Sequence, residues 1–254
     1  MITIIDYGVG NLFSLSSSLS YLGLENKVSR DPEDLRKADH IILPGVGAYG
    51  DAIAKLRGSG MAEPLLDEAK AGKPIMGICL GMQLLFDKSY EYGEHQGLGL
   101  IPGVMADLKE DIPANLKVPH MGWNSLHLTE KGKKHPLFKY SKEGDYVYFV
   151  HSFYGKDCDE SLLATSEYGI PVTASAANEN VMGCQFHPEK SGESRTADSE
   201  SVFGDIINRK SKKGNCFLQV CRLDLNSYGE ETDMELFPAI DLRTARRAPG
   251  AGRL

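Results

Sequence analysis

Residues 74–86 decide the fold of this chain: they read Pro-Ile-Met-Gly-Ile-Cys-Leu-Gly-Met-Gln-Leu-Leu-Phe. The apolar run 74–78 predicts a buried strand, and residues 80–86 predict a helix that turns one side to a core. Between them stands Cys79, with a glycine two positions away on each side. Small neighbours permit a tight turn from strand to helix, which exposes a nucleophile at the carboxyl end of the strand.

The same order of strand, turn and helix recurs along the first half of the chain. Residues 2–5 predict a strand, followed by leucines at helical spacing up to Gly23. Residues 38–43 predict a strand that stops at Pro44, with a glycine-rich turn and a helix over 51–56 behind it. This alternation predicts an α/β fold, a mostly parallel open sheet with helices on both faces.

The second half is less regular, with loop-like sequence expected over residues 91–142. We expect short strands at 98–101, around Trp123, at 146–150 and at 181–186.

Composition narrows the class of function. The chain has 254 residues, 41% of them hydrophobic, with a formal net charge of −7. This charge argues against a nucleic-acid partner, because such proteins concentrate Lys and Arg. Neither a secretory signal nor an apolar run long enough for a membrane span is present. Five cysteines without Cys-x-x-Cys spacing suggest neither a disulfide framework nor a zinc ribbon, so we expect a cytoplasmic protein with no membrane partner.

Three residues fit nucleophilic catalysis. A thiol reacts as its thiolate, which a helix N-terminus and a protonated imidazole favour, so Cys79 is the candidate nucleophile. His187 follows the strand predicted at 181–186 and is the candidate base, and Glu189 can orient the far side of its ring. The Leu80 amide would face the developing oxyanion. Taken singly, Cys79 could equally be a buried small hydrophobe and His187 an ordinary strand-end histidine.

The pair of motifs at residues 77–83 and 187–189 resembles the class I glutamine amidotransferase family, with its flavodoxin-like fold and nucleophile elbow. The resemblance implies further roles. Val46 would supply the second oxyanion amide. Glutamine would be bound by the remaining residues of the matched segments: Gly45, Gly47, Gln83, His151, Ser152 and Phe153. For Ser152 the alternative is a plain surface serine.

Three stretches, 5–12, 44–52 and 120–124, together with residues 189–191, resemble the glutaminase subunits that serve imidazole glycerol phosphate synthases, over roughly residues 1–194. That resemblance implies hydrolysis of glutamine to glutamate and ammonia through a Cys79 thioester, without metal or organic cofactor. Ammonia would pass to a separate cyclase subunit, forming imidazole glycerol phosphate in histidine biosynthesis. Asn11, Trp123 and Lys190 would lie in the heterodimer interface; their alternative interpretations are a loop cap, a core aromatic and a solvated lysine.

The chain departs from the family after residue 194, where a hydrophobic final helix is expected but residues 195–202 read Arg-Thr-Ala-Asp-Ser-Glu-Ser-Val. One choice of codons for residues 195–202 encodes a different peptide when the reading frame is shifted by one base. That peptide is Gly-Leu-Arg-Ile-Leu-Lys-Val, whose residues suit an amphipathic helix. We therefore expect a local frameshift, restored near 203–207. Residues 234–243 resemble the opening of a neighbouring pathway enzyme, an isomerase barrel. We expect an amidotransferase domain over 1–210 and a read-through tail without function over 211–254.

Two other functions fit parts of the pattern. A different cysteine hydrolase of the same fold, such as a γ-glutamyl peptidase, would need the same nucleophile, and a decayed noncatalytic homologue would explain the altered C-terminal sequence.

Overall fold

The computed structural model describes residues 1–139 and 141–191. The expected frameshift at 195–202, the domain boundary at 210 and the tail at 211–254 lie outside the described residues. In chain order the helices and strands of the described part are β1 (Ile2–Ile5), α1 (Leu12–Tyr21), β2 (Asn26–Ser29), α2 (Pro32–Lys37), β3 (His40–Leu43), α3 (Tyr49–Gly58), α4 (Ala62–Lys70), β4 (Ile75–Ile78), α5 (Leu80–Leu85), β5 (Phe86–Ser89), β6 (His95–Gln96), β7 (Ile101–Asp107), α6 (Leu108–Asp111), β8 (His120–Ser125), β9 (His127–Leu128), α7 (Glu130–Lys134), β10 (Tyr146–His151), β11 (Phe153–Lys156), β12 (Leu162–Glu167), β13 (Pro171–Asn178) and β14 (Val181–Cys184), with short 3₁₀ turns at Pro136–Phe138 and Asp159–Ser161.

A central sheet carries the fold, in the order β2-β1-β3-β4-β14-β13-β12-β9. Its strands from β2 to β14 are parallel, whereas β13, β12 and β9 continue it in antiparallel fashion. Strands β1, β3 and β4 are mostly apolar because both of their faces are covered. The α/β prediction with a mostly parallel sheet is confirmed.

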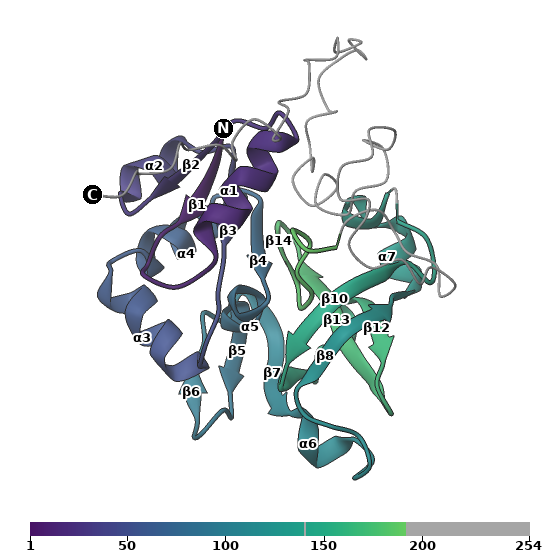
Figure 1. Ribbon diagram of the computed structural model, residues 1–254. Helices are drawn as coiled ribbons and strands as arrows, with labels where there is room; N and C mark the ends of the chain where they lie inside the picture. The colour runs from purple at the N-terminus through teal and green to yellow at the C-terminus, as the bar shows by residue number, and fades with distance from the viewer. Residues whose placement is uncertain (140, 192–254) are drawn as a thin grey trace, which may run out of the picture. The chain divides into compact units, whose positions relative to one another are not determined.

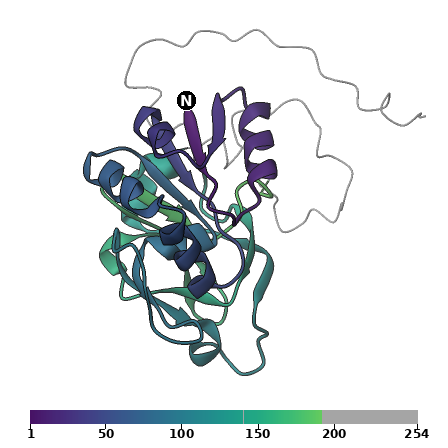
Figure 2. The ribbon, with the colours of Figure 1, turned by 90° about the vertical axis from the view of Figure 1, so that its left-hand side faces the viewer.

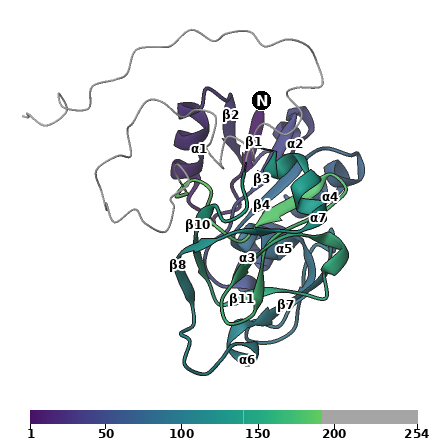
Figure 3. The same ribbon diagram turned by 90° about the vertical axis from the view of Figure 1, so that its right-hand side faces the viewer.

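Helices cover the two faces of the parallel strands. Ile4 points to one side, where Leu19 of α1 packs, and Ile5 points to the other, where Leu35 of α2 and Leu65 of α4 pack. Figure 3 shows α1 on one side of β1, β3 and β4, with α2 and α4 on the other, and Figure 2 shows the same layers from the opposite side. None of the helices in the described part is long and apolar enough to cross a membrane.

Two smaller sheets flank the central one: β10-β8, and β11-β7-β5-β6 (Figure 1). The expectation of loop-like sequence over 91–142 is therefore wrong for β7, which has seven residues, whereas β8 confirms the short strand expected around Trp123. The strand expected at 98–101 begins only at its last residue. Gly103, at φ +122°, lies inside β7, where the pairing of this strand with β5 is irregular. Phe86, expected in the helix, starts β5 instead.

Candidate active site

Cys79 occupies a strained turn between β4 and α5, with φ 53° and ψ −116°. A residue other than glycine adopts this conformation only where the surrounding structure enforces it. Here the enforcement is close packing: a Cβ at Gly81 would lie 1.9 Å from the Leu43 carbonyl oxygen, and one at Gly77 would lie 2.6 Å from the Met82 Cα. The sharp turn that the sequence predicts at residue 79 is thus present, with glycines where backbones meet.

His187 is held beside this turn by backbone and side-chain contacts. Its amide donates to the Tyr148 carbonyl at 2.9 Å, and its own carbonyl accepts from the Ser191 hydroxyl at 2.7 Å. The Ser191 hydroxyl in turn accepts from the Tyr148 amide at 3.1 Å. The buried serine therefore ties strand β10 to the turn that carries the imidazole.

The electrostatics of His187 follow from its neighbours. Burial alone would lower the pKa of His187, but hydrogen bonds to Cys79 and to Glu189, together with their negative charges, outweigh it and raise that pKa to about 9. Nδ1 of His187 lies 2.8 Å from Oε1 of Glu189, whose side chain is 3% exposed. The second oxygen, Oε2, is buried without a hydrogen-bond partner among the described residues. At neutral pH the ring is thus an imidazolium between a sulfur and a carboxylate.

The segment Gly45-Val46-Gly47 packs against the start of α5. A Cβ at Gly45 would lie 2.5 Å from the Gly81 nitrogen and 2.9 Å from the Leu80 carbonyl carbon, so only glycine permits this approach. Gly47 has φ +90° and open space around it, and Val46 is 44% exposed. Leu80, the first residue of α5, presents its amide at the helix N-terminus. The two segments predicted to form the oxyanion site are therefore adjacent.

Tyr7, two residues after the end of β1, supports this segment. Its hydroxyl donates to the Pro44 carbonyl at 2.8 Å. Burial, and then the neighbouring Cys79, raise the pKa of the Tyr7 phenol, so it stays a donor at neutral pH.

Three of the residues predicted to bind glutamine, Gln83, His151 and Phe153, are connected by hydrogen bonds to the Phe153 carbonyl. Gln83 is buried, and its amide nitrogen contacts the Gln185 side-chain oxygen at 2.9 Å and the Phe153 carbonyl at 3.5 Å. The same carbonyl accepts from His151 Nδ1 at 2.9 Å. Ser152 lies between β10 and β11, and its carbonyl accepts from the Leu108 amide at 2.9 Å, which ties this junction to the start of α6.

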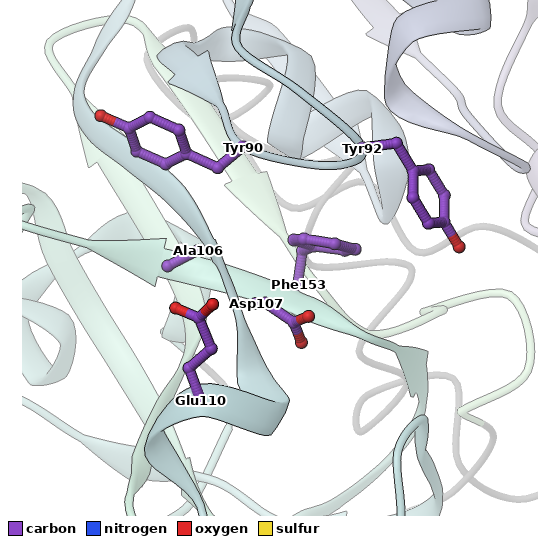
Figure 4. A pocket seen from close by; sticks show the side chains of 6 residues that line it. All are labelled: Tyr90, Tyr92, Ala106, Asp107, Glu110 and Phe153. Carbon is purple, nitrogen blue, oxygen red and sulfur yellow. The ribbon is translucent and has the colours of Figure 1, made fainter.

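A cavity of about 350 Å³ opens beside Phe153. Figure 4 shows six residues of its lining, with the Phe153 ring between Tyr90 and Tyr92. The carboxylates of Asp107 and Glu110 lie near each other, below the two tyrosines in this view. Cys79 is not among the residues that line this cavity, so the cavity alone does not identify where glutamine would meet the nucleophile.

The three residues predicted at a partner interface fall in two places. Trp123 of β8 packs edge-on against Tyr148, at 5.9 Å between ring centroids, and the Lys190 ammonium lies 5.2 Å from the same Tyr148 ring. Trp123 is 38% exposed, so it is not a core aromatic. Asn11 precedes α1, is exposed, and makes no side-chain capping hydrogen bond to that helix. Its neighbour Gly10 packs on Pro44, beside the glycine segment.

Two residues of this region escape prediction from the sequence. Gln185 places its amide nitrogen 3.7 Å from the Cys79 sulfur. The Glu91 carboxylate accepts from the Tyr49 amide at the start of α3, two residues after Gly47. Burial raises the pKa of Glu91. Both contacts join positions far apart in the chain, and no local spacing signals them. In the part of the chain that the structure describes, no group of three or more His, Cys, Asp or Glu side chains is arranged to hold a metal ion.

Comparison with known proteins defines the class. The family model described as "Glutamine amidotransferase class-I" matches residues 3–208, so the chain belongs to that family. Its relatives include the imidazole glycerol phosphate synthase subunit HisH of Caldanaerobacter subterraneus subsp. tengcongensis, 48% identical over 208 residues, with 82% of this chain and 98% of the relative covered. The subunit HisH of Lactococcus lactis is 49% identical over 193 residues, covering 76% and 92%. Within the family, the chain is thus a glutamine amidotransferase subunit of the HisH type.

Solved structures agree on the fold. A structure titled "Structure of PurLQS from Thermotoga maritima" is similar with a TM-score of 0.60 and 21% identity, and the match covers 86% of this chain and 95% of that one.

Proposed function

We propose that this chain hydrolyses glutamine through a γ-glutamyl thioester on Cys79 and passes the ammonia to a cyclase subunit that makes imidazole glycerol phosphate. The single observation that carries the chemistry is the strained Cys79 turn with the His187 imidazole beside it, which is itself hydrogen-bonded to Glu189. This arrangement holds a nucleophile, a proton donor and an orienting carboxylate in one place.

In the first step the Cys79 sulfur attacks the side-chain amide carbon of glutamine, and the carbon–nitrogen bond breaks. The leaving nitrogen takes the proton that His187 carries, so ammonia departs neutral. Water then attacks the thioester, gives its proton to His187 and releases glutamate, which restores the starting state. The amides of Leu80 and Val46 are the proposed donors to the oxyanion in both steps.

Delivery of ammonia requires a docked partner, since free ammonia is protonated in water. Support for a partner comes from the HisH relatives, which are named as subunits. It also comes from the exposed side chains of Met121 and Trp123. These residues are two positions apart in β8, so their side chains lie on the same face of the strand. Lys190 and Trp123 both contact the Tyr148 ring. Together with Met121 and Asn11 they make up the proposed docking surface. The proposed location is the cytoplasm, and the proposed amidotransferase domain spans 1–210.

The test is a glutaminase assay on the full chain with and without an added cyclase subunit and its ribonucleotide substrate. We expect glutamate release from free glutamine that rises when the cyclase subunit and its ligand are both present. Cleavage of γ-glutamyl peptides without any dependence on the cyclase subunit would instead identify a cysteine hydrolase of another kind. Absence of all turnover in a folded chain would identify a noncatalytic homologue.

A further inference from the structure

Gln185 lies between the two catalytic segments and belongs to neither motif. It directly follows β14 and is completely buried. Its backbone amide donates a hydrogen bond to the Ala174 carbonyl at 2.9 Å, which fixes the backbone of Gln185 to β13. Its side-chain Nε2 lies 3.7 Å from the Cys79 sulfur, within hydrogen-bonding range for sulfur. A buried amide pointing at a nucleophile is in a position to act on it.

The Phe153 carbonyl, acting through Gln83, fixes the orientation of the Gln185 side-chain amide. The Phe153 carbonyl can only accept, so the group of Gln83 that faces it must be the NH₂. The same NH₂ faces the Gln185 side chain at 2.9 Å, where it requires an oxygen. Turning the Gln185 amide over would bring two NH₂ groups together. The Gln185 NH₂ is therefore the group that faces Cys79.

We propose that Gln185 is a catalytic residue that donates a hydrogen bond to the Cys79 sulfur and favours the thiolate, with Gln83 as the positioning residue that fixes its amide. This inference rests on the proposed function, because it concerns the same nucleophile. A thiolate accepts hydrogen bonds far better than a thiol does, so a fixed donor stabilises the charged form selectively.

The proposal predicts the pH dependence of Cys79 reactivity. Among the residues that the structure describes, two titratable side chains interact with the sulfur: His187, in the turn after β14, and Tyr7, which follows β1. Neither changes in the variants below, so a shift between variants reports the amide.

The experiment measures the rate of Cys79 alkylation by iodoacetamide from about pH 5 to about pH 10, read by mass spectrometry on the tryptic peptide that contains Cys79. In Gln185→Met, which keeps the side-chain length without the donor, we expect the pH of half-maximal alkylation to rise by about 1 unit. Gln83→Met leaves Gln185 in place but frees its amide to rotate, and we expect a smaller rise in the same direction. The control, Gln96→Met, changes an exposed glutamine of β6 and should leave the profile unchanged.

The outcomes separate this inference from the proposed function. If Gln185→Met and Gln83→Met melt close to wild type and both keep the wild-type alkylation profile, Gln185 is only a satisfied core amide and the inference is wrong. Should Gln185→Met fail to fold, the Gln83→Met profile alone decides in the same way. The proposed function fails on a different result: no glutamate release by the wild-type chain with the cyclase subunit, whatever the alkylation profile.

Discussion

The imidazoles of His120 and His151 are joined by a hydrogen bond of 3.0 Å between His120 Nδ1 and His151 Nε2, in the buried pairing of β8 with β10. The Phe153 carbonyl fixes its direction. His151 must donate to that carbonyl from Nδ1, so a neutral His151 accepts at Nε2. His120 then donates from Nδ1 and accepts at Nε2, where the Asn124 amide nitrogen lies at 3.2 Å. This row of bonds is complete only when both rings are neutral.

Acidification should therefore destabilise the fold through this pair. Burial lowers the pKa of His151 to about 3 and that of His120 to about 4, below the unfolded value of about 6.5. Stability from the neutral rings is complete above pH 6.5 and is lost as the pH falls toward these folded values. We expect the free energy of unfolding to drop by about 3 kcal/mol from this source between about pH 7 and about pH 5, measured by urea titration.

Two variants provide the comparison. His120→Phe keeps the stacking against Phe149 and Tyr168 but removes one titrating ring, so its loss on acidification should be smaller than that of wild type. His127→Asn, at an exposed histidine of β9, should retain nearly the whole wild-type loss. Equal acid sensitivity in wild type and His120→Phe would show that other groups cause it.

Because the backbone at residue 79 is strained, we expect a substitution of Cys79 that removes activity to be able to raise the stability of the fold. Cys79→Ala should abolish glutaminase activity, by at least about 10⁴-fold, while the chain stays folded. Cys79→Gly should be as inactive yet more stable than Cys79→Ala by about 1 kcal/mol, because glycine accepts φ 53° without strain. Thermal unfolding of the two variants measures the difference. A glycine variant less stable than the alanine variant would show that residue 79 is not under strain.

Glu189→Gln tests the charge beside the imidazole. The pKa of His187 is raised to about 9, so its proton is present at neutral pH and lost as the pH rises through 9. Losing the Glu189 charge should lower that pKa and shift the alkaline limb of the glutaminase profile to lower pH. The rate should also fall by about 10²-fold or more, since an amide does not enforce the productive tautomer. An alkaline limb at the wild-type position would contradict the assigned contact.

The parts of the fold that the sequence predicts are those in which the local pattern of residues reflects their burial or backbone conformation in the folded chain. Strands β1, β3 and β4 are mostly apolar, and the glycines around Cys79 signal the turn directly. Strand β13 reads Pro-Val-Thr-Ala-Ser-Ala-Ala-Asn, and its small, partly polar residues give no strand signal although most are buried. In the site, the contact of Gln185 with Cys79 spans 106 positions, and only the folded sheet brings them together.

Close backbone packing makes a further prediction at two glycines. Gly81→Ala places a Cβ against the Leu43 carbonyl oxygen, backbone against backbone, where neither side can yield. We expect a loss of about 3 kcal/mol or more in the free energy of unfolding. Gly47→Ala meets no atom within 4 Å, and its cost should be only the strain of φ +90°, about 1 kcal/mol. Chemical denaturation compares the two, and similar losses would mean that packing at the elbow is not what requires glycine.

Trp123 predicts the strength of docking to the cyclase subunit. Its indole is 38% exposed and is supported edge-on by Tyr148, so it offers a large apolar surface that is already ordered before binding. Trp123→Ala should weaken the affinity for the cyclase subunit by about 10- to 100-fold, measured by calorimetric titration, without changing the melting temperature much. Tyr21→Ala is the matched control, since this aromatic is 75% exposed at the end of α1, outside the proposed docking surface. If both variants bind the cyclase subunit as wild type does, Trp123 lies outside the interface, and the docking surface must be sought on another face, because an ordered aromatic buried by a partner cannot be removed without cost.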